Sequence, residues 1–190
     1  MKAELDNMRT YILPFADPDA RIRIMFGDEA GFGRISDPSD CWAPSGMRPI
    51  VPCHHIREYE YAYGAVDPIN GDSFFFIMPN CNSECMNIFL RELSAAFPKD
   101  YILLPLDNAM WHKSKALVIP DNIRLFYLPP RTPEMNPIEQ IWKEIRKRGF
   151  KNVIFQTLQK VVIRLCDTCN SLTNDCVKSI TGRDWLLSIF

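Results

Sequence analysis

The sequence has no apolar run of the roughly 18 residues that a membrane-spanning helix requires. Residues 1–20 contain acids and prolines where a secretory signal would need a continuous apolar stretch. Internal repeats and low-complexity tracts are missing as well. We therefore expect a cytoplasmic protein with no membrane partner.

The chain also lacks an excess of charge of either sign, since 22 Lys and Arg residues balance 23 Asp and Glu residues. The balance changes along the chain. Residues 1–106 carry 9 basic and 15 acidic residues, whereas residues 107–190 carry 13 basic and 8 acidic residues. This asymmetry permits an anionic partner on the C-terminal part without demonstrating one.

A regular cysteine framework is absent too. The seven cysteines are an odd number at irregular positions, which in a cytoplasmic chain favours buried thiols over disulfides. Cys166 and Cys169 form a C-x-x-C motif, but it lies in a helical pattern and does not follow a strand. We therefore interpret the cysteines as small apolar side chains and not as metal or redox groups.

With 190 residues, 47% of them hydrophobic, the chain can bury one sizeable core and is too short to favour two domains. We expect a lead-in segment at 1–20 and one α/β domain over 21–190 that ends in helices. The predicted strands are 21–28, 57–67, 73–79, 101–107 and 122–129, and the predicted helices are 83–97, 112–117, one from 136, and 155–169. Asn70-Gly71 predicts a hairpin turn between the second and third strands. This order is typical of a mixed sheet covered by helices.

Three carboxylates are the candidate catalytic and metal-binding residues. Asp28 and Asp107 each stand where an apolar strand is predicted to stop, and Glu139 lies near the start of a helix. If these elements pack together, three acids converge and repel one another unless a cation neutralises them. Oxygen ligands suit Mg²⁺ or Mn²⁺. Two such ions roughly 4 Å apart would stabilise both oxygens of an in-line displacement at phosphorus.

Each acid also has a structural interpretation. Asn136, Pro137 and Glu139 occupy N-cap, N1 and N3 positions, so this segment taken alone favours a capping box. Asp28 and Asp107 could be ordinary turn residues that follow strands. The prolines at 129, 130, 133 and 137 stiffen the approach to Glu139 and would fix its position relative to the strands.

The helix that follows Glu139 has two different faces. An apolar stripe at helical spacing predicts a face packed on the core, and it consists of Ile138, Ile141, Trp142 and Ile145. Lys143, Arg146 and Lys147 continue along the flank from the acid. Such basic residues most often form a solvated face, but here they would suit the phosphate backbone of a nucleic acid.

Five motifs in this order resemble the catalytic domain of bacterial insertion-sequence transposases of the mariner-like superfamily. They are GDEAGFG, WAPSG-x-RP, YGAVDP-x-NG, LDNA-x-WHKS and LPPRTPEMNPIE-x-IW, and the resemblance covers about residues 21–155. It implies an RNase H-like fold of the retroviral integrase superfamily, a mixed five-stranded sheet flanked by helices. It also implies a D-D-E triad of Asp28, Asp107 and Glu139 with two divalent metal ions. Asn108 and His112 belong to the second motif and are expected to support the site.

The resemblance further implies a DNA partner, namely transposon ends and a target, typically at TA dinucleotides. Such proteins carry helix-turn-helix segments, which we expect upstream or on a separate chain, and a homodimer is compatible with this class. The expected location is the bacterial cytoplasm, at the nucleoid. The main alternative is a catalytically inactive, transposase-derived remnant that associates with DNA or has a regulatory role. A phosphohydrolase for small substrates is a third possibility, but neither aspartate lies in the nucleophile motif of such enzymes.

Overall fold

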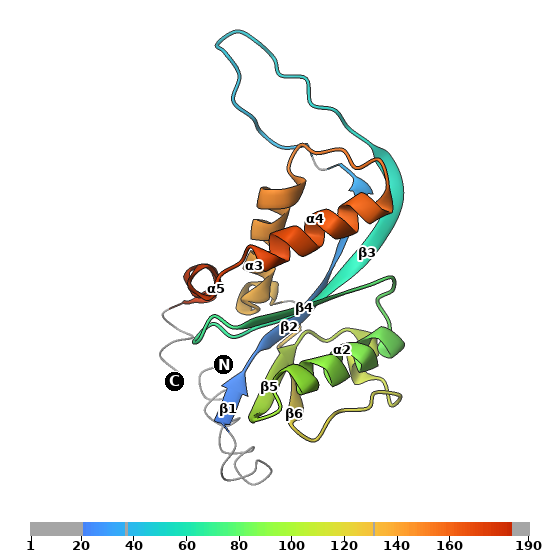
Figure 1. The fold of residues 1–190 in the computed structure, drawn as a ribbon, viewed down its shortest axis with the longest axis vertical. Coiled ribbons are helices and arrows are strands. Elements are labelled where there is room, and N and C mark those ends of the chain that lie inside the picture. The colour runs from blue at the N-terminus through green and yellow to red at the C-terminus, as the bar shows by residue number, and fades with distance from the viewer. Residues whose placement is uncertain (1–20, 37, 131, 184–190) are drawn as a thin grey trace.

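The computed structural model describes residues 21–36, 38–130 and 132–183 (Figure 1). The predicted lead-in segment at 1–20 lies outside the described residues. The strands are β1 (Arg21–Ile24), β2 (Phe26–Ile35), β3 (His55–Val66), β4 (Ser73–Met78), β5 (Asp100–Leu106) and β6 (Ile123–Tyr127). The helices are α2 (Ser83–Ala96), α3 (Ile138–Ile145), α4 (Leu158–Asn170) and α5 (Asn174–Thr181). Shorter helical turns are η1 (Met110–Lys113), η2 (Pro133–Met135) and the π-helical η3 (Arg146–Phe150).

The strands form two three-stranded sheets, so the prediction of one five-stranded mixed sheet is wrong in that form. β1, β5 and β6 are parallel, whereas β2, β3 and β4 are antiparallel. Met25 alone separates β1 from β2, and its backbone N–H still donates to the Leu103 carbonyl over 2.9 Å. The chain therefore passes directly from one sheet to the other at this residue.

The first predicted strand also ends later than expected. It was predicted to stop at Asp28, but β2 continues to Ile35 because β3 offers an antiparallel partner along almost its whole length. Asp28 is thus the third residue of a strand and not a residue at its end. Its counterpart Asp107 does follow β5 directly, as predicted.

The β3–β4 hairpin is confirmed. The Asp67 carboxylate accepts hydrogen bonds from the backbone N–H groups of Ile69 and Asn70, which shapes the turn. Gly71 has a φ of +77°, a conformation that L side chains rarely adopt. A Cβ at Gly71 would also lie 2.1 Å from the Asn174 carbonyl oxygen, so the turn packs tightly against the start of α5.

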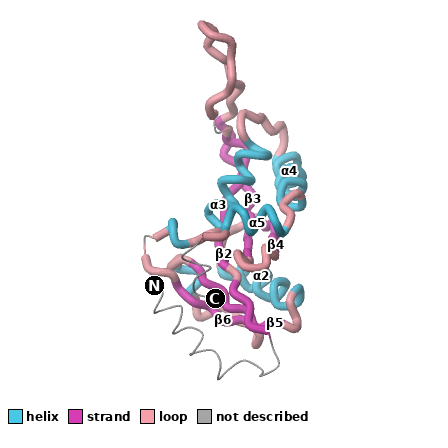
Figure 2. The backbone as a smooth tube through the Cα atoms, turned by 90° about the vertical axis from the view of Figure 1, so that its left-hand side faces the viewer, coloured by secondary structure: helices cyan, strands magenta, loops and turns pink. Residues whose placement is uncertain are grey.

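Helices cover the strands on both faces, as Figures 1 and 2 show, with α2 on one side and α3 and α4 on the other. Side chains alternate along the strands into two buried clusters. Met25, Tyr63 and Leu104 pack with α2, whereas Phe26 and Leu103 pack with α3 and α4. The segment 38–54 between β2 and β3 projects from one end of the molecule in both views.

Several boundaries differ from their predicted positions. The short helix predicted at 112–117 is η1, which begins two residues earlier and ends four residues earlier. The helix predicted from 155 starts at Leu158, where the Thr157 side chain accepts from Lys160 N. None of the seven cysteines, all of them within the described residues, is in a disulfide. Cys41 and Cys53 are exposed, so the prediction of buried thiols is wrong for these two. No helix in the described part of the chain is both long and apolar enough to cross a membrane.

Candidate functional site

Three acids from separate parts of the chain line one cavity of about 380 Å³. Asp28 comes from β2, Asp107 from the end of β5 and Glu139 from the first turn of α3. We call this the acidic cavity. The remainder of its wall consists of Asn108, Ala109, Leu128, Pro129, Pro130, Thr132 and Asn136. The structure thus brings together the three carboxylates that were singled out in the sequence.

Asp28 is held by α3. The indole Nε1 of Trp142 donates to the Asp28 carboxylate over 2.9 Å. Burial raises the pKa of Asp28 to about 7, and the negative charges of Glu29 and Glu139 raise it as well, while the bond from Trp142 opposes them. Burial is thus the main reason why Asp28 holds its proton more strongly than usual, and the nearby acids add to it. A cation beside this carboxylate would counter both effects.

Asp107 is more exposed, with 57% of its side chain accessible. Its carboxylate accepts a hydrogen bond from Ala109 N and lies 2.9 Å from the Nδ1 atom of His112. The bond to His112 holds the pKa of Asp107 below its usual range. This carboxylate therefore gives up its proton more readily than Asp28, whose pKa is shifted in the opposite direction.

His112 links Asp107 to a further buried acid. Its side chain is fully buried, and its Nε2 lies 2.9 Å from an oxygen of Glu29, whose side chain is 5% exposed. Burial lowers the pKa of His112, but the hydrogen bonds and charges of Asp107 and Glu29 outweigh it and raise the pKa to about 10. An imidazolium between two carboxylates therefore fixes η1 against β2. Sequence reasoning missed Glu29, although the Asp28-Glu29 pair beside a buried strand was a visible signal.

Asn136 does not cap α3, so the capping-box interpretation of Glu139 is wrong. The N-cap position belongs to Pro137, and the Asn136 amide instead donates to the Gly27 carbonyl over 3.0 Å. The Asn136 side chain thus ties the segment before α3 to β2 and does not close the first turn of the helix. The Asn136 Oδ1 atom is buried and has no hydrogen-bond partner among the described residues.

The apolar stripe of α3 packs as predicted, with Ile138, Ile141, Trp142 and Ile145 all buried. Trp142 also needs a gap in the neighbouring strand. A Cβ at Gly64 would lie 2.7 Å from the far edge of its indole ring. Glycine in β3 thus allows the close approach that puts the indole N–H on Asp28.

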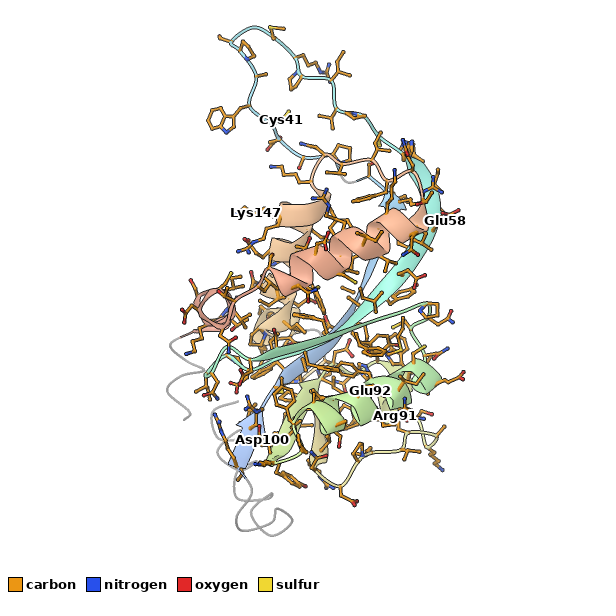
Figure 3. All side chains as sticks on the ribbon, in the orientation of Figure 1. Cys41, Glu58, Arg91, Glu92, Asp100 and Lys147 are labelled. Atoms are coloured by element: carbon orange, nitrogen blue, oxygen red, sulfur yellow. The ribbon has the colours of Figure 1, made fainter. Side chains whose placement is uncertain are left out.

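The predicted nucleic-acid residues lie outside the acidic cavity. Lys143 is exposed, and Lys147 is 74% exposed with its Nζ 3.7 Å from Glu144. Arg146 places its guanidinium 4.9 Å from the centre of the Phe32 ring and donates to the Gly31 carbonyl. Figure 3 shows Lys147 at the end of the molecule from which the segment 38–54 projects. The basic residues therefore continue away from the acids along α3 and η3.

Divalent ions fit the chemistry of the acidic cavity, since its ionisable walls offer oxygen donors only, with the unpartnered Asn136 Oδ1 beside them. Among the described residues, however, no group of three or more His, Cys, Asp or Glu side chains is arranged to hold a metal ion. The three carboxylates share a cavity without meeting at one point. Asp107 has the most room to turn, because more than half of its side chain is accessible.

Comparisons with known proteins agree with this picture. A family model described as a DDE superfamily endonuclease matches residues 23–162. An uncharacterized protein of Sinorhizobium fredii, y4pE/y4sA, is 36% identical over 130 residues, which covers 67% of this chain and 96% of that protein.

Solved structures of low identity share the fold. The Mos1 transposase paired-end complex with the left transposon end gives a TM-score of 0.65 at 13% identity, over 95% of this chain and 56% of that chain. A pre-cleavage Mos1 transpososome gives 0.67 at 12% identity, over 95% and 57%. An intasome of simian T-cell lymphotropic virus gives 0.50 at 13% identity, over 84% and 52%. The chain thus has the RNase H-like fold and spans just over half the length of the Mos1 chains.

Proposed function

Because the chain belongs to the DDE superfamily of endonucleases, we propose that it is the catalytic domain of a transposase. The reaction is divalent-metal-dependent hydrolysis of a phosphodiester at a transposon end, followed by strand transfer to target DNA, typically at TA. The observation that carries this proposal is the shared cavity of Asp28, Asp107 and Glu139. These residues lie 79 and 32 positions apart along the chain, so it is the fold and not their sequence neighbourhood that puts all three acids on the wall of one cavity.

The three carboxylates are the proposed ligands of two Mg²⁺ or Mn²⁺ ions. When bound, such ions supply activation of the attacking water and stabilise the charge on the attacking and leaving oxygens. Asp28 must give up its proton before it can bind a cation, because burial and nearby acids hold its pKa near 7. Asp107 is already ionised, and its exposure lets it turn toward the other two acids.

Two neighbours are proposed to position these acids. Trp142 donates to one oxygen of Asp28, which leaves the other oxygen for a cation. His112 holds Asp107 through Nδ1 and is itself held by Glu29. The bond from Trp142 restricts Asp28 before a ligand arrives, which is how a supporting shell improves the precision of a site. The contact with His112 keeps Asp107 beside the cavity, although its exposed carboxylate can still turn.

DNA is the proposed partner, with Lys143, Arg146 and Lys147 on its phosphates. All three side chains are basic and reach the surface of the same helical segment. Contacts of this kind bind any sequence and weaken steeply with salt. Specific recognition of transposon ends would need a helix-turn-helix segment, which stays a prediction, as does a homodimer.

The test is nicking of supercoiled plasmid DNA in the presence of Mn²⁺ or Mg²⁺. The wild-type chain should nick the plasmid, and Asp107→Ala should abolish this activity. Asp121→Asn, which alters an exposed acid before β6 that does not line the acidic cavity, serves as the matched control and should nick normally.

The same assay separates the alternatives. Equal background nicking by the wild type and Asp107→Ala would favour the inactive, DNA-associated remnant. Hydrolysis of a generic phosphomonoester without any action on DNA would favour a small-substrate phosphohydrolase.

A further inference from the structure

A second, larger cavity lies between β2 and η3. Its volume is about 510 Å³, within the range of ligand-binding cavities. We call it the aromatic cavity. Its wall consists of Gly31, Phe32, Gly33, Ile35, Ser36, Ser39, Tyr59, Arg146, Lys147, Phe150, Lys151, Val153 and Phe155, none of which lines the acidic cavity.

Aromatic rings form much of this wall. Phe150 lies 5.0 Å from Phe32 and 5.3 Å from Phe155, measured between ring centres. Phe32 and Phe155 are nearly buried, so they serve as a fixed base, whereas Tyr59 is 38% exposed. Gly33 makes room for Tyr59, because a Cβ at that position would lie 2.4 Å from the ring. The cavity therefore presents one accessible ring supported by the strand below it.

The charge of the wall is entirely positive among its described residues. Arg146, Lys147 and Lys151 line the cavity, and no Asp or Glu does. Arg146 is held in place by the Phe32 ring and by the Gly31 carbonyl. Lys151 is exposed, and Lys147 is partly engaged by Glu144. Arg146 thus offers an anion a cation of fixed position, and Lys151 offers an exposed one.

A ligand that matches both the aromatic rings and the positive charge of this wall has a flat apolar part and a negative charge. A nucleotide has both, since its base stacks on aromatic rings and its phosphate pairs with Lys and Arg. We propose that the aromatic cavity binds one unstacked nucleotide of a DNA strand, with the base against Tyr59 and the phosphate at Arg146 and Lys151. This inference rests on the proposed function, because it takes DNA as the substrate.

The acidic and the aromatic cavities are both lined by β2 and by the continuous helical segment of α3 and η3. Asp28 and Gly33 are five residues apart on β2, which corresponds to roughly 17 Å at about 3.3 Å per residue. Glu139 and Arg146 are seven residues apart along α3 and η3, or roughly 10 Å at about 1.5 Å per residue. These two distances correspond to roughly three to five nucleotides at about 3.4 Å per nucleotide. The nucleotide in the aromatic cavity would therefore lie that many positions from the phosphate at the acidic cavity.

Binding of a fluorescein-labelled single-stranded oligonucleotide tests the proposal, measured by anisotropy in EDTA so that no metal contributes. Tyr59→Leu keeps an apolar side chain but removes the ring, and should weaken binding at least about fivefold. Tyr59→Phe keeps the ring and should bind as the wild type does. Lys151→Gln should weaken binding and flatten its salt dependence, whereas Lys160→Gln, an exposed lysine of α4 outside the cavity, should do neither.

A 2-aminopurine in the oligonucleotide supplies a second readout, because its fluorescence rises when the base leaves the stack and is quenched when it stacks on a ring. Wild type and Tyr59→Leu should differ in this signal at saturating protein. Unchanged affinity and unchanged fluorescence in Tyr59→Leu and Lys151→Gln, with melting temperatures like the wild type, would overturn the proposal. So would a loss of self-association in Tyr59→Leu with DNA binding intact, because the cavity would then serve a second copy of the chain.

Plasmid nicking separates this proposal from the proposed function. If nicking depends on Asp107 while oligonucleotide binding is unchanged in Tyr59→Leu and Lys151→Gln, the nucleotide site in the aromatic cavity is wrong and the proposed endonuclease function is supported. If binding depends on Tyr59 and Lys151 but no nicking occurs with either metal, the nucleotide site stands and the endonuclease is wrong.

Discussion

The indole Nε1 of Trp142 donates to the Asp28 carboxylate across 2.9 Å, which joins α3 to β2 at the wall of the acidic cavity. The bond links a residue of the buried stripe of α3 directly to a proposed metal ligand. One side chain therefore takes part both in the packing of this helix and in the placement of the carboxylate.

Trp142→Phe should keep the packing of α3 but raise the pKa of Asp28 further, because the bond from Trp142 lowers it. A hydrogen bond to a charged group contributes about 1.5–3 kcal/mol, so the pKa should rise by about one to two. Since protons compete with cations for this carboxylate, Mn²⁺ affinity measured by calorimetry between pH 6 and 8 should fall off at a higher pH in Trp142→Phe. Superimposable pH profiles for the two proteins would contradict this role.

Asp28→Asn should make the protein more stable at neutral pH while abolishing nicking. The raised pKa of Asp28 favours its protonated form in the folded state, so the stability it contributes is complete below about pH 4 and is lost as pH rises through about 7. The Asn side chain does not ionise, so Asp28→Asn does not lose stability in this way as pH rises. Thermal melting should give a melting temperature for Asp28→Asn a few degrees above the wild type at pH 8, with the difference shrinking toward pH 4.

His112→Ala should destabilise the fold by about 3–5 kcal/mol, because it leaves the Glu29 carboxylate buried without its partner. Glu29→Gln in the same chain removes the unpaired charge and should restore part of this loss. Nicking should stay low in the double variant, since Asp107 has still lost its support. Urea denaturation of both single variants and the double variant measures the coupling; additive losses would show that the two side chains act independently.

The pH dependence of stability should reflect the same cluster. The pKa of His112 is raised to about 10, so the stability it contributes is complete below about pH 6.5 and is lost as pH rises through about 10. The melting temperature of the wild type should therefore decline over this range, and His112→Ala should show a flatter profile.

Asn136→Asp separates the two interpretations of the segment before α3. Asp is about as good an N-cap residue as Asn, so a capping box predicts little change. The structure instead predicts a loss of about 1–3 kcal/mol, because Asp cannot donate to the Gly27 carbonyl. Urea denaturation at pH 7 measures the difference. If Asn136→Asp is as stable as the wild type, the capping-box interpretation is supported instead.

Local patterns predicted the elements that depend on local chemistry. Asn70-Gly71 located the hairpin, and the 3.6-residue period located the buried face of α3. Asp107 after an apolar strand and Glu139 near the start of a helix were located correctly, and both line the acidic cavity. Asp28 lines it as well, although it was selected for a strand end that the structure places seven residues later.

Features that depend on distant partners could not be predicted in this way. The passage between two sheets at Met25 follows from which strands are available as neighbours, β5 on one side and β3 on the other. Asn136 had a good capping position by sequence, but the Gly27 carbonyl, 109 residues earlier, takes its amide. The Glu29–His112 pair spans 83 residues, and neither residue alone suggests the other.

Anomalous diffraction from crystals soaked in Mn²⁺ tests the central claim most directly. The account predicts metal density in the acidic cavity, coordinated by oxygens of Asp28, Asp107 and Glu139, with Asp107 turned inward. Well-ordered crystals in which any one of these carboxylates stays directed away from bound metal, or in which the cavity takes up none, would contradict it.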